Sequence, residues 1–304
     1  MLQMSLSRRV VLGSIVGAVA GLAAPGASGA RDDGGVVVLG QVSLSFYAVV
    51  GAVVQQVLER LGHAVQVREG PHESMFPLLS DGAIDLMVAA WLPEGHAQYW
   101  ARYGGEAREV TSLYDGARFF WAVPDYVPSD AVSTIADLAS PPVLERMTRD
   151  IQAIGDGAAI TTASKTALER YGLADSYRVL PGSSALWLET YRRLHARGDW
   201  FVFPAWTPQF LNSAGTLREL GDPLGVLGHG NRAVLVAPSI RFDALPARTR
   251  RALARVQLSL DDVNRMDWAV NVDGRSAREA ARDWLDSNAD LVARWLGGHE
   301  ITID

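Results

Sequence analysis

Cysteine is absent from all 304 residues of the chain. The protein can therefore form no disulfide, carries no thiolate nucleophile and has no cysteine to which a lipid anchor could be attached. An oxidising compartment would tolerate such a chain, although the chain makes no use of that chemistry. We therefore expect a protein that is not a lipoprotein.

Long apolar runs are also scarce, and the one at the N-terminus is typical of an export signal. Arg8 and Arg9 precede the apolar residues 10–24, and small residues follow at 28–30. That apolar core is too short and too rich in glycine and alanine for a membrane anchor. The segment 7–12 resembles a twin-arginine signal, and an ordinary secretory signal is the alternative. We predict that residues 1–30 are cleaved and that the mature protein is free in a bacterial periplasm.

Positive charge is in the minority, with 28 lysines and arginines against 34 acidic residues and a formal net charge of −6. Removal of Arg8 and Arg9 with the signal peptide would take this charge to −8. Nucleic acids and anionic membranes bind proteins through clustered basic residues, and the sequence has no basic run. We therefore expect neither as a partner.

Motifs of catalysis and of metal binding are missing too. No G-x-S-x-G nucleophile motif occurs, and the glycines of 155–157 lack the spacing and the lysine of a phosphate-binding loop. His72-Glu73 and His96 do not have the H-E-x-x-H spacing of a helical metal site. We therefore predict a protein that is not an enzyme and that needs no metal or cofactor.

The chain instead alternates short apolar segments with amphipathic ones, which is typical of a doubly wound α/β fold. From Val49 to Leu61 the apolar residues fall on one helical face, and Gly62 follows at the position of a C-cap. This helix belongs to a predicted half-sheet made of strands at 36–39, 64–67 and 84–90 and helices at 49–61 and 75–79.

A second alternation follows, and it predicts a second lobe. The second lobe is predicted from strands at 151–154, 178–180 and 201–203 and helices at 160–171 and 184–196, which follow a strand at 119–123 that precedes the crossing. A returning strand at 232–237 rejoins the first lobe, and three helical segments close the chain. We expect one lobe of residues 31–124 plus 227–304 and another of residues 125–226. Two lobes joined by two crossings enclose a cleft that closes by a hinge. Trp268, Trp284 and Trp295 lie in the closing helices and are interpreted as packing anchors.

Two short motifs repeat in corresponding places, Trp91-Leu92-Pro93 and Trp206-Thr207-Pro208. Each follows an apolar segment that reads as a buried strand, and ligands of open α/β sheets bind outside the carboxyl ends of strands. A single tryptophan there is more often a packing residue. Two of them in matching positions of two lobes would face each other across the cleft, and Phe46 and Tyr47 add a third aromatic patch.

Aromatic faces attract cations, and a quaternary ammonium group has no N–H donor that must be satisfied. We therefore predict a quaternary ammonium ligand, with Trp91, Trp206, Tyr47 and Phe46 around its cation. A carboxylate on such a ligand would need donors, which helix N-termini near Ser45 and near Gly157 and Ala158 can supply. His72 is a further candidate for ligand binding.

These motifs together resemble the glycine betaine/proline betaine substrate-binding proteins of ABC importers. The resemblance covers about residues 36–296 and is carried by Ile84-Asp85-Leu86-Met87 before Trp91-Leu92-Pro93, by His96, by Tyr99-Trp100, by Tyr171-Gly172-Leu173, by Gly182-Ser183-Ser184, by Trp206-Thr207-Pro208 and by Asp222-Pro223-Leu224-Gly225. It implies a two-lobed fold like that of type II periplasmic binding proteins, joined by a two-crossing hinge. It also implies a monomer that delivers its solute to a permease and ATPase complex in the inner membrane, with Trp91 and Trp206 in an aromatic box.

The sequence departs from that family at several positions. Some members have a tryptophan in the turn that corresponds to 155–157, and the loop after the first strand here is neither tryptophan-bearing nor acidic. Trp187 stands where smaller residues are usual, and it faces either the core or the cleft. One alternative is therefore the same fold binding an amino-acid-like amine through Asp156 and Glu73. Another is a sensing lobe that is not coupled to transport.

Overall fold

Parallel strands alternate with helices at the start of the computed structural model, which describes residues 36–297. The elements in order are β1 (Val37–Val42), α1 (Ser45–Arg60), β2 (Val65–Gly70), α2 (His72–Ser80) and β3 (Leu86–Leu92). β1 pairs in parallel with both β2 and β3. This is the half-sheet that the hydrophobic pattern predicts. The predicted signal peptide, residues 1–30, lies outside the described residues.

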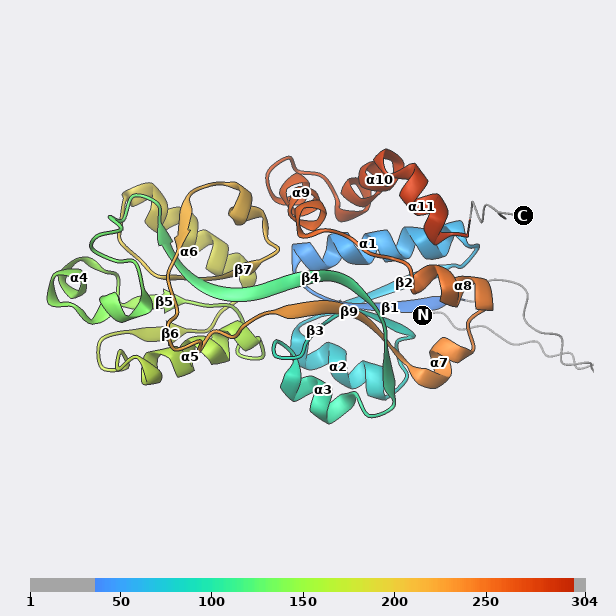
Figure 1. Cartoon of the computed structure of the whole chain (residues 1–304), viewed down its shortest axis with the longest axis horizontal. Helices are drawn as coiled ribbons and strands as arrows, with labels where there is room; N and C mark the ends of the chain where they lie inside the picture. Colours follow the sequence, from blue (N-terminus) through green and yellow to red (C-terminus); the bar gives the residue numbers. More distant parts are fainter. Residues whose placement is uncertain (1–35, 298–304) are drawn as a thin grey trace, which may run out of the picture. The chain divides into compact units, whose positions relative to one another are not determined.

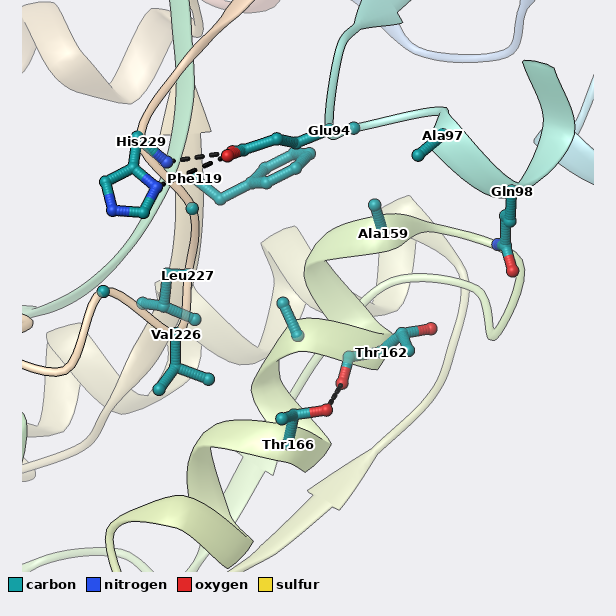
Figure 2. Close-up of a pocket in the computed structure, with 14 residues that line it drawn as sticks. Glu94, Ala97, Gln98, Phe119, Ala159, Thr162, Thr166, Val226, Leu227 and His229 are labelled. Carbon is teal, nitrogen blue, oxygen red and sulfur yellow. Dashed lines mark hydrogen bonds and ion pairs between the residues drawn. The ribbon is translucent and has the colours of Figure 1, made fainter. Parts of the chain in front are cut away.

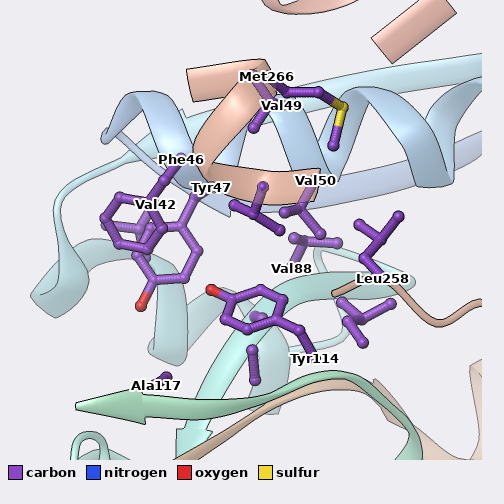
Figure 3. Packing of buried hydrophobic residues seen from close by; sticks show 14 of the residues in the cluster. Val42, Phe46, Tyr47, Val49, Val50, Val88, Tyr114, Ala117, Leu258 and Met266 are labelled. Carbon is purple, nitrogen blue, oxygen red and sulfur yellow. The ribbon is translucent and has the colours of Figure 1, made fainter. Parts of the chain in front are cut away.

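Helix α1 forms because its apolar residues recur on one face, and that face is buried along the whole helix. Gly62 follows the helix with a φ of +93°, a conformation that favours glycine, as expected for a helix stop. α1 packs against α9 (Leu260–Asn271) and α10 (Ala277–Ser287) on one side of the sheet, whereas α2 lies on the other side (Figure 1). Figure 3 shows the core between these layers, where Val49 and Val50 of α1 meet Met266 of α9.

The long strand β4 (Ala107–Pro124) joins the two halves of the sheet (Figure 1). Its first part pairs antiparallel with β9 (Asn231–Pro238), and its last part pairs antiparallel with β7 (Phe203–Thr207) and β8 (Leu217–Glu219). The sequence predicts a strand only at 119–123. The earlier part is irregular, because register shifts between residues 109 and 117 break the alternation of buried and exposed side chains.

The resulting sheet has the order β2-β1-β3-β9-β4-β7 within the described residues, with β8 beside β4. β5 (Asp150–Gln152) and β6 (Arg178–Leu180) form a separate parallel pair. The second half is therefore less regular than the predicted doubly wound sheet, since β7 runs antiparallel to β4. The division into lobes at residues 124 and 227 stays a prediction.

The remaining elements surround these strands. They are α3 (Ala97–Tyr103), η1 (Ile135–Ala139), α4 (Pro141–Arg146), α5 (Ala159–Arg170), α6 (Ser184–Arg197), η2 (Phe210–Ser213), α7 (Ser239–Asp243), α8 (Ala247–Leu253) and α11 (Ala289–Trp295). Trp284 and Trp295 are buried and stack with ring centroids 5.8 Å apart, and Trp268 packs partly buried against the same core. Their predicted role as packing anchors is confirmed. Among residues 36–297, no helix is both long and apolar enough to cross a membrane.

The contact between α1 and the closing helices can be tested with Leu58→Ala. Leu58 is fully buried on α1, so its truncation leaves a cavity and should lower the free energy of unfolding by about 3 kcal/mol. Gln55→Ala, on the less buried side of the same helix, is the control and should cost about 0.5 kcal/mol or less. Chemical denaturation measures both values. Equal losses of unfolding free energy in the two variants would show that the packing of α1 against the closing helices does not stabilise the core.

Candidate functional site

Aromatic side chains from both halves of the sheet surround a narrow cavity of about 20 Å³. We call it the aromatic cavity. Its walls come from the first turn of α1, the start of α2, the ends of β3 and β7, β4 and the start of α5. The lining residues are Leu44, Phe46, Tyr47, His72, Trp91, His96, Phe119, Ile154, Ala158, Ala159, Ile160 and Trp206. None of them carries an acidic side chain.

Trp91 is fixed at the end of β3 by one hydrogen bond from its backbone and one from its indole ring. Its backbone N–H donates to Nδ1 of His96 at 2.8 Å, and its indole N–H donates to the hydroxyl of Tyr114 at 3.0 Å. The ring lies 5.3 Å from that of Phe119, centroid to centroid. Since its indole N–H is already used, Trp91 offers a ligand its aromatic surface.

Trp206 lies near the end of β7, opposite Phe119 on β4, and residues opposite each other in an antiparallel pair share one face of the sheet. One face of its indole is covered by Trp187, which stacks on it with centroids 4.8 Å apart. Trp187 is buried and donates its own indole N–H to the carbonyl of Pro204 at 2.9 Å. Trp187 therefore supports Trp206 from behind.

Phe46 and Tyr47 close the cavity from the first turn of α1, and both are buried. The Phe46 ring lies 5.5 Å from Trp91 and 6.0 Å from Trp206, so it joins the two tryptophans. The Tyr47 ring lies 6.0 Å from Trp91 and 6.5 Å from His96. Burial raises the pKa of Tyr47 well above its ordinary value, so its hydroxyl stays protonated at neutral pH.

The two histidines of the cavity are neutral. Burial lowers the pKa of His72 to about 4, and burial together with the nearby His72 lowers the pKa of His96 well below 6.5. Because Nδ1 of His96 accepts from the backbone of Trp91, the proton of His96 lies on Nε2. At neutral pH the lining of the aromatic cavity therefore bears no ionised side chain.

The other predicted site residues lie around this cavity in different ways. Ala158 lines it, whereas Gly157 lies just beside it and accepts a hydrogen bond from the Tyr99 hydroxyl at 2.8 Å. A Cβ at Gly157 would meet the ends of the Glu73 and Tyr99 side chains, which are flexible enough to move aside. Asp156 is exposed and pairs with Lys165 at 2.6 Å. Ser45 faces a neighbouring pocket.

That neighbouring pocket, which we call the donor pocket, shares Leu44, Phe46 and Trp206 with the aromatic cavity and has a volume of about 230 Å³. Several N–H groups lie at this pocket. α1 begins there without a side-chain cap, and α6 begins there too, so first-turn N–H groups of both helices lack intrahelical partners. The other lining residues are Ser43, Ser45, Ser184, Ala185, Trp187, Leu188, Gln209, Phe210 and Asn271.

Two buried side-chain donors of this pocket have no hydrogen-bond partner among the described residues, the indole N–H of Trp206 and the amide Nε2 of Gln209. Leaving a buried donor unpaired is costly, so such groups indicate a missing acceptor. Sequence reasoning missed Gln209 and the start of α6, where Gly182-Ser183-Ser184 reads only as a cap. Ser183 does cap α6, since its hydroxyl oxygen accepts from the N–H of Leu186.

A wider groove of about 420 Å³ opens beside the aromatic cavity (Figure 2). It shares Phe119 and Ala159 with the cavity and runs between α5 and the segment 225–229. Glu94 lies at its rim, where its carboxylate accepts from the backbone N–H of His229 at 2.9 Å. Since Thr162 and His229 are exposed, the groove leads from solvent to the aromatic cavity.

The arrangement can hold a small molecule with a cation at one end and an acceptor at the other. Aromatic faces without ionised neighbours suit a cation that has no donors, and clustered N–H groups suit a carboxylate. Residues 36–297 contain no group of three or more His, Cys, Asp or Glu side chains placed to hold a metal ion.

Comparison with known proteins agrees with this geometry. Residues 35–287 match a family model described as the substrate binding domain of the ABC-type glycine betaine transport system. The glycine betaine/carnitine transport binding protein GbuC of Listeria monocytogenes serotype 1/2a (strain 10403S) is 28% identical over 158 residues, which are 51% of this chain and 52% of GbuC. The chain thus spans about half the length of that curated relative.

Solved structures share the fold. Lactococcal OpuAC in its closed conformation with glycine betaine gives a TM-score of 0.78 at 21% identity, over 86% of this chain and 99% of that one. ProX of Borrelia burgdorferi gives 0.78 at 21% identity, over 86% and 96%. A choline binding protein of an ABC transporter, in complex with choline, gives 0.77 at 20% identity, over 86% and 91%. The similarity confirms the type II periplasmic-binding-protein-like fold predicted from the sequence.

The neutral state of His72 predicts how the free energy of unfolding depends on pH. Its folded pKa of about 4 lies below the 6.5 of the unfolded chain, so its contribution to stability is full above pH 6.5 and is lost as the pH falls toward 4. Between pH 7 and pH 5, His72→Gln should therefore lose about 1–2 kcal/mol less free energy of unfolding than the unmodified protein.

Denaturant titrations at several pH values measure this difference. Thr162→Val changes an exposed residue that does not titrate and serves as the control, with a pH profile parallel to that of the unmodified protein. Parallel profiles for His72→Gln as well would mean that His72 is not held neutral by its surroundings.

Proposed function

Because this chain belongs to the family of substrate-binding domains of ABC-type glycine betaine transport systems, we propose that it captures a betaine-like quaternary ammonium zwitterion and delivers it to the permease and ATPase of an importer. The observation that carries this proposal is the pairing of the aromatic cavity, whose lining is uncharged, with an adjoining pocket of unpaired N–H donors. Each end of a betaine matches one of these two sites.

The cationic end fits the aromatic cavity. Each aromatic face over a desolvated cation contributes about 0.5–2 kcal/mol, and Trp91, Phe46 and Trp206 present such faces within one small space. A primary ammonium would lose its hydrogen bonds to water there, because no acidic side chain lines the cavity. A trimethylammonium group makes no hydrogen bonds to water, so it loses no comparable interaction when it enters the cavity. The cavity therefore favours methylated amines.

The anionic end fits the donor pocket. A carboxylate there would accept from Nε2 of Gln209 and the indole N–H of Trp206, and from first-turn N–H groups of α1 and α6. This supports a zwitterion over choline, whose hydroxyl would satisfy fewer of these donors. It also argues against the amine alternative, since Asp156 is paired with Lys165 outside the cavity.

Ligand capture then follows from the predicted lobes, 31–124 plus 227–304 and 125–226. The hydrogen bond from Tyr99 to the carbonyl of Gly157 and the contact between Phe46 and Trp206 each cross that predicted boundary. A solute between these walls would hold them together, and the groove beside Phe119 would be its route of entry. With the signal peptide removed, we expect a periplasmic monomer that docks on its permease.

Titration calorimetry with a methylation series tests the cationic end. Affinity should rise from glycine through dimethylglycine to glycine betaine, and betaine should bind more tightly than choline. Trp91→Leu and Trp206→Leu should each weaken betaine binding by about 10- to 100-fold, because each removes one cation–π face with its packing. Trp100→Leu alters a tryptophan outside the cavity and should bind as before. Tighter binding of glycine than of betaine would refute the proposal.

Gln209→Glu tests the anionic end. The substitution keeps the side-chain oxygen that accepts from the N–H of Leu211 but replaces the unpaired Nε2 donor with a charged oxygen. Betaine affinity should fall by roughly 10- to 100-fold, as expected for the loss of a hydrogen bond to a charged group, whereas choline should bind at least as well as before. Gln98→Glu makes the same change in the wider groove beside the aromatic cavity and is the matched control. An equal loss for both ligands would contradict the assignment.

A further inference from the structure

Asp267 is a carboxyl group buried completely behind the aromatic cavity. It lies on α9, and its hydrogen-bond partners are neutral. One oxygen accepts from the backbone N–H of Phe210 at 2.7 Å, and the other accepts from the amide of Asn271 at 3.0 Å. The Asn271 amide also donates to the Ser45 hydroxyl oxygen at 3.0 Å, so it connects the carboxylate to the first turn of α1.

These partners lie directly beside the residues that form the cavity. Phe210 follows the Trp206-Thr207-Pro208 motif, so its N–H fixes the segment that leaves β7. Ser45 is the first residue of α1 and precedes Phe46 and Tyr47. Helix α9, which carries Asp267, makes a second contact with the segment after β7. Oδ1 of Asn264 on this helix accepts from the backbone N–H of Gln209 at 2.8 Å.

The remaining wall is connected through Tyr114. Its hydroxyl accepts the indole N–H of Trp91, and the charge of Asp267 acts on it electrostatically. Figure 3 shows the Tyr114 hydroxyl turned toward the side on which Phe46 and Tyr47 lie. Asp267 thus connects directly to the segment after Trp206 and, through Asn271, to the first turn of α1.

We propose that Asp267 is a positioning residue that holds the Trp206 side of the aromatic cavity against the first turn of α1, and that its ionised form is the one that holds them for ligand binding. This inference rests on the proposed function for its binding readout. The carboxylate accepts from the N–H of Phe210 through one oxygen and from the amide of Asn271 through the other, whereas a proton on either oxygen weakens that oxygen as an acceptor.

Of Asp267 and the groups that face it, only Asp267 gains or loses a proton near neutral pH. Burial raises the pKa of Asp267 to about 6. From β4 it is faced by Tyr114, whose pKa burial raises far above neutrality, and from the other elements by Ser45, Asn271 and the backbone of Phe210, which do not titrate. The cavity histidines have pKa values lowered by burial, with His72 at about 4.

The sign of the effect separates positioning from simple stabilisation. A carboxyl pKa raised by folding means that the contribution of Asp267 to stability falls as the pH rises through 6. Ligand affinity should change in the opposite direction and be greater above pH 6, where the ionised group holds both walls. A purely structural role would move affinity and stability together.

Calorimetry with glycine betaine from pH 5 to pH 8 tests this on the mature protein. Asp267→Asn should bind about tenfold more weakly at pH 7.5, as expected for the loss of hydrogen bonds to a charged acceptor, and should show little pH dependence. The unmodified protein should lose affinity by a comparable factor below pH 6. Asp261→Asn, an exposed carboxylate on the same helix, is the control and should match the unmodified protein.

A measurement without ligand keeps the inference testable on its own. In spectra of the ¹⁵N-labelled protein, the indole N–H signals of Trp91 and Trp206, identified with Trp91→Phe and Trp206→Phe, should titrate with a midpoint near pH 6. Asn271→Ala should move this midpoint upward, because it removes a donor to the ionised form. Asp267→Asn should abolish the titration.

The two proposals fail in different ways. Titrating indole signals in a protein that binds no quaternary ammonium compound would refute the proposed function and leave the role of Asp267 supported. Indole signals that stay constant from pH 5 to pH 8, or betaine binding by Asp267→Asn with the affinity and pH profile of the unmodified protein, would overturn the positioning role.

Discussion

The site depends on aromatic rings that meet around a narrow cavity and are fixed from behind. Apolar surfaces exposed to water tend to associate, so a cavity walled by such rings needs support from behind. Trp91 is held by Tyr114 and His96, and Trp206 is backed by Trp187, whose indole is itself bound to the carbonyl of Pro204. These contacts lie outside the cavity and leave the inner faces free.

Burial sets the electrostatics of this space as well. The same desolvation that lowers the pKa values of His72 and His96 keeps both imidazoles neutral, so the cavity presents a cation with neither a competing charge nor an acidic partner. The N–H groups gather instead in the donor pocket, on the far side of Phe46 and Trp206. Cation and carboxylate of one ligand are thereby received by separate surfaces, which is a physical basis for preferring a zwitterion.

Much of this could be predicted from the sequence, because the informative signals are local. An apolar run before Trp91-Leu92-Pro93 indicates a buried strand that ends in an aromatic residue, and the periodicity of 49–61 indicates a helix. Phe46, Tyr47, His72 and Ala158 join both tryptophans in one cavity. Ser45 and Gly157 lie beside it. The assignment of these residues to ligand binding stays a prediction, as does the division into lobes.

The parts that the sequence did not reveal depend on pairing between distant segments. Phe119 enters the cavity because β4 pairs with β7 and sets it opposite Trp206, in a strand whose earlier residues have an irregular register. Asp267 follows Phe210 by 57 residues, so no local pattern connects that carboxylate with the site. Gln209 is an ordinary polar residue in the sequence, and only its buried, unpaired amide distinguishes it.

A crystal structure of the mature protein with glycine betaine tests the central claim most directly. The account predicts the quaternary nitrogen within about 6 Å of the ring centroids of Trp91 and Trp206, with a carboxylate oxygen about 3 Å from Nε2 of Gln209 or the indole nitrogen of Trp206. Betaine bound instead in the groove beside Glu94, with the aromatic cavity filled by its own side chains, would contradict it.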